Sequence, residues 1–144
     1  MGFIDKRKGL PFLLTAFIIL ADQGVKTLIV KIWSQNGSMI KDVFGNGLLY
    51  IVHVRNKAIA FSLGENLPEF IRPALFIILP VIVLVFLVRY YWKSPDFSGL
   101  QRWAVAGIIG GGLGNIIDRI FRPDGVVDFI SVKFYGFLGL ERWP

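Results

Sequence analysis

Several polar side chains interrupt stretches of this chain that are otherwise apolar. Asp22 and Lys26 are four positions apart, a spacing that puts both on one face of a helix. Asn115 and Asp118 are three apart and also share a face, with Arg119 beside Asp118. Ionisable groups inside apolar segments are costly and are therefore candidates for function. The alternative for each set is structural: a self-neutralising Asp22–Lys26 pair, and a helix-end ion pair between Asp118 and Arg119.

Asp128 has a different setting, between Val127 and Phe129 in a short apolar stretch. Removal from water there favours the protonated acid, which can share a proton with a second group. A lone aspartate in such a stretch is more often a cap or turn residue, and Asn56, at the end of a β-branched run, has the same alternative. We expect His53, on that run, to pack in the core or on the surface.

The composition excludes several kinds of protein and of site. The 144 residues contain no cysteine, so a disulfide framework and a cysteine nucleophile are excluded. His53 is the single histidine, which argues against a polyhistidine metal site and a Ser-His-Asp triad. Hydrophobic residues make up 54% and charged residues 18% of the chain, which is not the composition of a disordered chain. The net charge of +6 fits either a nucleic-acid binder or a membrane protein with basic flanks.

The lengths of the apolar runs favour a membrane protein over a nucleic-acid binder. A helix of about 20 residues spans a bilayer. We expect such spans at about residues 10–31, 70–92 and 101–121. Pro80, in the middle of the second run, is expected to kink the helix without ending it, which helices in lipid tolerate.

Glycines in the third span predict close helix packing. Gly107 and Gly111 are four apart, and so are Gly110 and Gly114. Small residues at this spacing let another helix backbone approach closely inside a membrane. The predicted fold class is therefore an integral membrane α-helical bundle, formed by residues 1–144 as a single membrane-embedded domain.

Basic residues flank the spans and predict their orientation. They crowd the N-terminal tail and the short loop between the second and third spans, namely Lys6, Arg7, Lys8, Arg89, Lys93 and Arg102. Because positive charge favours the cytoplasmic side, both regions are expected there. Segments 34–69 and 122–144 would then lie outside. The basic residues form no continuous stripe, so we predict no nucleic-acid partner.

The outer segment 34–69 has the composition of a small sheet. Tyr50–Arg55 is rich in β-branched residues, and Gly45-Asn46-Gly47 is typical of a turn. We expect a small extracytoplasmic β-sheet platform near the mouth of the helices, which brings Asn56 toward Asp128.

These residues together resemble the lipoprotein signal peptidases, the signal peptidase II family. Asp22-Gln23-Gly24-Val25-Lys26 is similar to the family's Asp-Gln-x-x-Lys motif. Asn56-Lys57-Ala58-Ile59-Ala60-Phe61 is similar to its Asn-x-Gly-Ala-Ala-Phe block, with Ala58-Ile59 in place of Gly-Ala. The most specific match is Gly114-Asn115-Ile116-Ile117-Asp118-Arg119, followed by Val126-Val127-Asp128-Phe129.

The resemblance implies an aspartic endopeptidase of the bacterial inner membrane. Such enzymes cut prolipoproteins on the amino side of a diacylglyceryl-modified cysteine, using water activated between two aspartates. It implies that Asp128 is the first catalytic aspartate and that Asn56, Asn115 and Arg119 are polar residues around the site. Asp22 and Lys26 would support the site, and Asp118 would be a structural partner.

The family also has an Asn-x-Ala-Asp-Ser motif, which supplies the second catalytic aspartate and opens a fourth span. Residues 1–144 do not contain it, and Glu141 is the one carboxylate after Asp128. We therefore expect a truncated member with three of four spans, inactive in this form and active when extended through that motif.

A non-enzymatic membrane scaffold or transport subunit is the alternative function. Residues beyond Pro144 in the reading frame would distinguish the two. The resemblance implies no metal or organic cofactor. The expected partners are diacylglyceryl-prolipoprotein substrates and the lipid bilayer, and the expected state is a monomer with its site at the outer membrane face.

Overall fold

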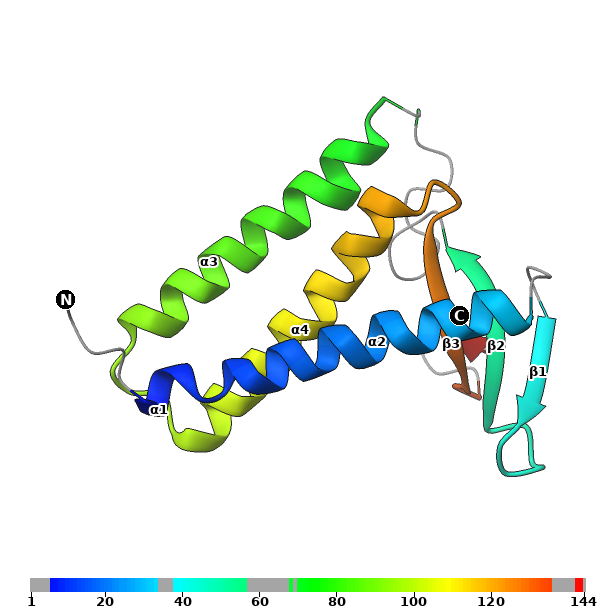
Figure 1. Ribbon diagram of the computed structural model, residues 1–144, viewed down its shortest axis with the longest axis horizontal. Coiled ribbons are helices and arrows are strands. Elements are labelled where there is room, and N and C mark those ends of the chain that lie inside the picture. The colour runs from blue at the N-terminus through cyan, green and yellow to red at the C-terminus, as the bar shows by residue number, and fades with distance from the viewer. Residues whose placement is uncertain (1–5, 34–37, 57–67, 69, 136–141, 144) are drawn as a thin grey trace. The chain divides into compact units, whose positions relative to one another are not determined.

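The computed structural model describes residues 6–33, 38–56, 68, 70–135 and 142–143 (Figure 1). Two compact units make up the chain. Unit 1 consists of Met1–Gln23 and Pro68–Phe121, and unit 2 consists of Gly24–Leu67 and Arg122–Pro144. The prediction of one domain over residues 1–144 stays a prediction.

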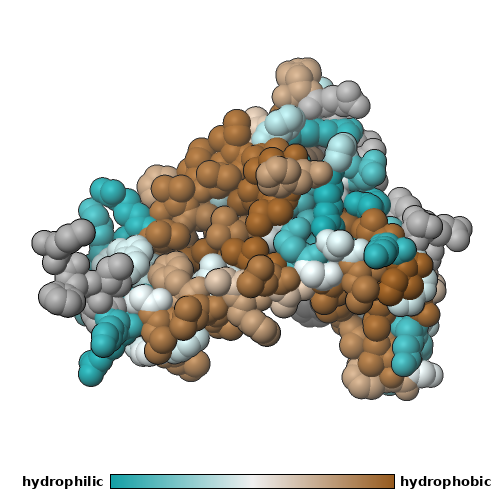
Figure 2. Space-filling view, in the orientation of Figure 1, coloured by the Kyte–Doolittle hydropathy of each residue, from teal (hydrophilic) through white to brown (hydrophobic). Residues whose placement is uncertain are grey.

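Three helical segments of the described chain are long and apolar enough to cross a membrane. The first comprises α1 (Lys6–Gly9) and α2 (Phe12–Ile32), the second a π-helical turn, η2 (Ala74–Ile78), with α3 (Leu79–Lys93), and the third α4 (Gly99–Phe121). The predicted helical bundle with three spans is confirmed. Figure 2 shows apolar side chains over the helices of unit 1 and hydrophilic ones near the α1 end.

The second span continues through Pro80, as the sequence predicts. Proline has no N–H to donate to the carbonyl four residues earlier, and its ring crowds that carbonyl. The irregularity takes the form of the π-helical turn just before it, where the N–H of Leu79 donates to the carbonyl of Ala74. A wider turn of this kind is a common way to fit an irregular residue into a helix.

Glycines of α4 let α2 approach closely. A Cβ atom at Gly110 would lie 3.0 Å from Cβ of Ile18, and one at Gly114 would lie 2.5 Å from Oδ2 of Asp22. The Gly110/Gly114 pair therefore has the predicted role. A Cβ at Gly111 would meet no atom of the described surroundings within 4 Å, so the prediction for Gly111 is wrong.

The end of unit 1 where α1 meets the end of α3 has an aromatic core. Tyr91 is completely buried and packs with Val105 and Ile109 of α4. Its ring meets that of Phe12 edge-to-face, with the centroids 5.2 Å apart. The Tyr91 hydroxyl donates to the carbonyl of Lys8 at 2.7 Å, which ties α1 to the end of α3.

Unit 2 contains an antiparallel sheet whose strands follow the order β1-β2-β3-β4. The strands are β1 (Ser38–Asp42), β2 (Leu49–Asn56), β3 (Val126–Lys133) and β4 (Arg142–Trp143). The predicted small sheet is confirmed, and β2 contains the β-branched run from which it was inferred. No strand was expected in residues 122–144, yet β3 of that segment pairs with β2 on both sides of a register irregularity between Ile51 and Val54.

Candidate functional site

Asn56 and Asp128 meet across two strands of unit 2. Nδ2 of Asn56 donates a hydrogen bond to Oδ2 of Asp128 at 3.0 Å. In the β2–β3 register, Asn56 pairs with Val126 and Asp128 pairs with Val54. The two side chains are therefore diagonal neighbours on one face of the sheet, a relation that lets polar side chains touch. Residues 57–62 of the block that begins at Asn56 lie outside the described residues.

The turn before β3 fixes where Asp128 falls in this register. The N–H of Gly125 donates to the carbonyl of Arg122 at 3.0 Å, which closes a turn through Pro123 and Asp124. Gly125 has φ 101°, a conformation that residues with a Cβ rarely adopt. The predicted turn at 123–125 is present, and Asp124 is exposed in it.

Burial around Asp128 differs from one residue to the next. Val126 and Val127 are buried, at 3% and 0% exposure, whereas Asp128 is partly exposed. Burial of the two valines holds this part of β3 in place, and the partial exposure of Asp128 leaves its carboxylate within reach of a ligand. That combination suits an acid that exchanges protons with water or a substrate.

A second polar cluster lies in unit 1, between α2 and α4. Nε2 of Gln23 lies within hydrogen-bond distance of three acceptors: Oδ2 of Asp22 at 3.1 Å, the carbonyl of Gly114 at 3.1 Å and Oδ1 of Asp118 at 3.0 Å. Asp118 is fully buried. The amide therefore joins two aspartates from two helices. The close approach at Gly114 makes this possible, because a larger residue there would collide with Asp22.

Asn115 and Arg119 lie on another side of α4. Asn115 is exposed, and Nη1 of Arg119 donates to its backbone carbonyl at 3.3 Å, within the helix. Their predicted convergence with Asp128 on one cleft concerns both units and stays a prediction.

Lys26 and His53 are buried polar residues of unit 2. Lys26, on α2, is 2% exposed, so it is not a solvated surface lysine. His53, on β2, is 1% exposed, and its Nδ1 donates to the carbonyl of Trp33, just after the end of α2. This bond joins the sheet to the helix within unit 2, so the core alternative for His53 is correct.

Gln23 is the residue that the sequence reasoning missed. Gln23 is part of the Asp-Gln-x-x-Lys motif, but the motif by itself indicates no role for its amide. Its residue type is a signal for such a role, since a side-chain amide inside an apolar span needs hydrogen-bond partners as much as an acid does. What the sequence lacked was the identity of those partners, which are more than 90 residues away along the chain. Among the described residues, no group of three or more His, Asp or Glu side chains is placed to hold a metal ion.

Comparisons with known proteins point to one family. The family model described as signal peptidase (SPase) II matches residues 14–144. The chain is 49% identical to the lipoprotein signal peptidase of Treponema denticola over 135 residues, which are 94% of this chain and 76% of that protein. It is 43% identical to the lipoprotein signal peptidase of Treponema pallidum over 141 residues, 98% of this chain and 75% of that protein.

The fold is similar to that of two solved structures, both described as bacterial membrane enzyme structures by the in meso method. With one, at 2.3 Å resolution, the TM-score is 0.73 at 26% identity over 92% of this chain and 76% of the other. With the second, at 1.9 Å resolution, it is 0.72 at 26% identity over 94% of this chain and 79% of the other.

Proposed function

The chain belongs to the signal peptidase II family, and from this premise we propose a specific reaction and site for it. The proposed reaction is hydrolysis of a prolipoprotein on the amino side of its diacylglyceryl-modified cysteine, which releases the signal peptide. The proposed chemistry is that of an aspartic endopeptidase, with Asp128 as a catalytic carboxylate.

The observation that carries the assignment of Asp128 is its hydrogen bond from Asn56. An amide N–H that donates to one carboxylate oxygen fixes the orientation of the carboxylate plane. Asn56 also stabilises the ionised form, which is the form that accepts a proton from water. Both side chains stand on strands, and rigid elements hold a catalytic group more accurately than loops do.

Aspartic peptidases need two carboxylates that share one proton. Close carboxylates do not both ionise readily, so one serves as acid while the other serves as base. The pair then titrates as a unit. Of the two aspartates in this scheme, Asp128 is the one that we assign among the described residues.

The remaining predicted site residues receive supporting roles. We assign Asn115 and Arg119 to the polar surroundings of the scissile peptide, which the exposure of Asn115 supports. Asp118 is assigned a structural role, because it is fully buried and accepts a hydrogen bond from Gln23. Asp22 and Lys26 are assigned to the support of the site from α2.

A substrate with two acyl chains explains why the enzyme is membrane-embedded. The acyl chains can stay in lipid while the peptide bond reaches a carboxylate at the interface. We place the enzyme in the bacterial inner membrane as a monomer, with its N-terminus in the cytoplasm and Asp128 at the outer face. The basic residues Lys6, Arg7 and Lys8 support this orientation.

Impermeant cysteine labelling in intact cells tests the orientation. Reagent should modify Ser38→Cys, in β1, and leave Ser94→Cys, between α3 and α4, unmodified until the cells are opened. The opposite pattern would reverse the topology.

The test of the reaction is release of the signal peptide from a diacylglyceryl-modified prolipoprotein, using the full reading frame that encodes this chain. Asp128→Asn keeps the size of the side chain but removes its acid–base function, so turnover should fall by about 10²–10⁴-fold. Asp124→Asn is the matched control, since it makes the same change at an exposed turn residue nearby. It should keep nearly normal turnover.

Metal chelators should leave cleavage unchanged. Full activity of Asp128→Asn would refute the assignment of that residue. Failure of the unaltered protein to cleave a modified prolipoprotein that a known lipoprotein signal peptidase cleaves would refute the proposed reaction.

A further inference from the structure

A basic cavity lies at the α1 end of unit 1, formed by α1, the loop after α3 and the first turn of α4. Its volume is about 700 Å³. Arg7, Lys8 and Arg102 contribute three cationic side chains, and Phe97 and Trp103 contribute aromatic rings. None of the described residues that line the cavity is acidic. A volume of this size is typical of a site for a small organic ligand.

Arg102 is the residue whose bonding is incomplete. It is 7% exposed, and its Nη1 is buried with no hydrogen-bond partner among the described residues. Its Nη2 lies 3.5 Å from the carbonyl of Ser94, at the limit of a hydrogen bond. A buried donor without an acceptor is unfavourable, and a buried charge without a counter-charge is more so. An anionic hydrogen-bond acceptor would therefore stabilise the Arg102 guanidinium.

Neighbouring groups support this charge without neutralising it. The guanidinium carbon lies 5.4 Å from the ring centre of Tyr91 and 5.8 Å from that of Phe97, which are cation–π distances. Asp96 is next to Phe97 in sequence, but it is exposed and does not line the cavity. A guanidinium that lies over the faces of two aromatic rings keeps its planar set of donors available for a phosphate.

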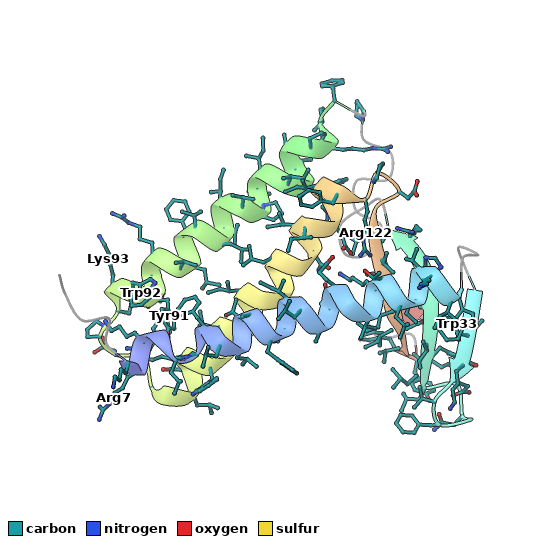
Figure 3. The ribbon with its side chains drawn as sticks, in the orientation of Figure 1. Arg7, Trp33, Tyr91, Trp92, Lys93 and Arg122 are labelled. Carbon is teal, nitrogen blue, oxygen red and sulfur yellow. The ribbon has the colours of Figure 1, made fainter. Side chains whose placement is uncertain are left out.

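Lys8 is fixed at the same cavity. Its Nζ donates to the carbonyl of Trp92 at 3.1 Å, at the C-terminal end of α3. Figure 3 shows Arg7, Tyr91, Trp92 and Lys93 at this end of unit 1. Two cationic groups beside a buried guanidinium favour a ligand with one or more negative charges.

The start of α4 is partly capped by its own side chains. Ser98 and Gln101 form a reciprocal cap: the N–H of Ser98 donates to Oε1 of Gln101 at 2.8 Å, and the N–H of Gln101 to Oγ of Ser98 at 3.3 Å. The cap engages the N–H groups of Ser98 and Gln101, and the buried guanidinium of Arg102 is the group that distinguishes this cavity.

The aromatic residues of this end indicate the level of the bilayer. Tyr90, Trp92 and Trp103 are 60%, 39% and 40% exposed at the ends of two predicted spans. Tyrosine and tryptophan at span ends lie at the level of the lipid headgroups. We propose that this cavity binds the phosphate of an anionic phospholipid headgroup through Arg102, with Lys8 and Arg7 as further charges. None of the residues that line this cavity is among the proposed catalytic residues.

Lipid titration of the purified protein in an uncharged detergent tests the proposal. The probes are short-chain phosphatidylglycerol, short-chain phosphatidylcholine and inorganic phosphate. Native mass spectrometry counts bound lipid, and the thermal unfolding midpoint reports stabilisation. Phosphatidylglycerol should bind saturably and raise the midpoint, with phosphatidylcholine weaker because its choline offsets the charge.

Arg102→Gln should weaken phosphatidylglycerol binding about tenfold or more, since hydrogen bonds to charged groups are worth that much. Arg102→Lys keeps the charge but loses the planar donors, so its affinity should be intermediate. Arg89→Gln is the matched control, because Arg89 is exposed on α3 and does not line the cavity. It should bind phosphatidylglycerol like the unaltered protein.

Three outcomes of these titrations distinguish a lipid headgroup site, a site for free phosphate and the absence of an Arg102-dependent site. Arg102-dependent stabilisation by phosphatidylglycerol, without the same effect from inorganic phosphate, supports a lipid headgroup site. Equal Arg102-dependent stabilisation by both probes supports a phosphate site and assigns it to the free anion. Unchanged phosphatidylglycerol binding in Arg102→Gln and Arg102→Lys, or an equal loss in Arg89→Gln, would overturn the proposal. Should Arg102→Gln not fold, Arg102→Lys carries the same comparison.

Discussion

Two aspartates ten residues apart, Asp118 in unit 1 and Asp128 in unit 2, have opposite environments. Asp118 is fully buried between helices and is bound by the Gln23 amide. Asp128 stands on a strand, partly exposed, with the Asn56 amide on one oxygen. Helix packing encloses the first acid, whereas the sheet presents the second. The difference supports a structural role for Asp118 and a chemical role for Asp128.

Substitution of Asp128 should have the greatest effect on turnover. The Asp128→Asn variant should lose turnover by about 10²–10⁴-fold while its thermal unfolding midpoint stays close to that of the unaltered protein. Asparagine can still accept the hydrogen bond from Asn56 through its carbonyl oxygen. Thermal unfolding in detergent, measured beside the cleavage assay, checks this. A large fall in the midpoint would make Asp128 a structural residue like Asp118.

The next effect concerns the Asn56 amide. Asn56→Ala removes the donor that orients Asp128, so turnover should fall by about 10–100-fold, the range of one hydrogen bond to a charged group. Steady-state kinetics of signal-peptide release measure it. Val54→Ala, on the same strand, is a control for loss of side-chain volume. An equal loss of turnover in both variants would argue against a specific role for the amide.

Substitution of Asp118, in the polar cluster between α2 and α4, should change the stability of the fold. Asp118→Leu leaves the partly buried Gln23 amide without one of its acceptors, so the free energy of unfolding should fall by about 1–3 kcal/mol. Asp118→Asn restores an acceptor oxygen and should regain most of that loss. Unfolding of both variants in detergent gives the comparison. Equal stability of the two would show that the Gln23–Asp118 hydrogen bond contributes little.

Two glycines one turn apart on the same helix test the packing of α4. Gly114→Ala places a Cβ 2.5 Å from Oδ2 of Asp22, closer than van der Waals contact allows, so stability should fall by about 1–3 kcal/mol, the usual range for overpacking. Gly111→Ala places its Cβ away from all described atoms. It should be neutral or slightly stabilising, because alanine favours helix by about 1 kcal/mol over glycine. The reverse order of stabilities would contradict the close approach at Gly114.

The smallest effect is expected at Thr15, whose hydroxyl donates to the carbonyl of Ala106 at 2.8 Å between α2 and α4. Thr15→Val keeps the shape and removes the donor, so stability should fall by about 0.5–1.5 kcal/mol. A change in turnover at constant stability would mean that the α2–α4 contact also acts on the reaction.

The helical spans, the strand at Tyr50–Arg55 and the turn at 123–125 could be predicted from the sequence alone. Each follows from local patterns: long apolar runs, a β-branched run and a Pro-Asp-Gly step. It also singled out Asp128 and Asn56, through motif resemblance and through the cost of polar groups in apolar settings.

Which residues meet depends on how the elements pack and could not be predicted from local patterns. The β2–β3 register brings Asn56 to Asp128, 72 positions later in the chain, and no local pattern encodes that distance. The same holds for Gln23, whose partners on α4 depend on how the two helices pack. It holds also for Gly111, which has the same four-residue spacing as Gly110 but lies on a face where a Cβ would meet no described atom within 4 Å. Spacing along a helix tells which residues share a face, whereas the packing of other elements decides what that face touches.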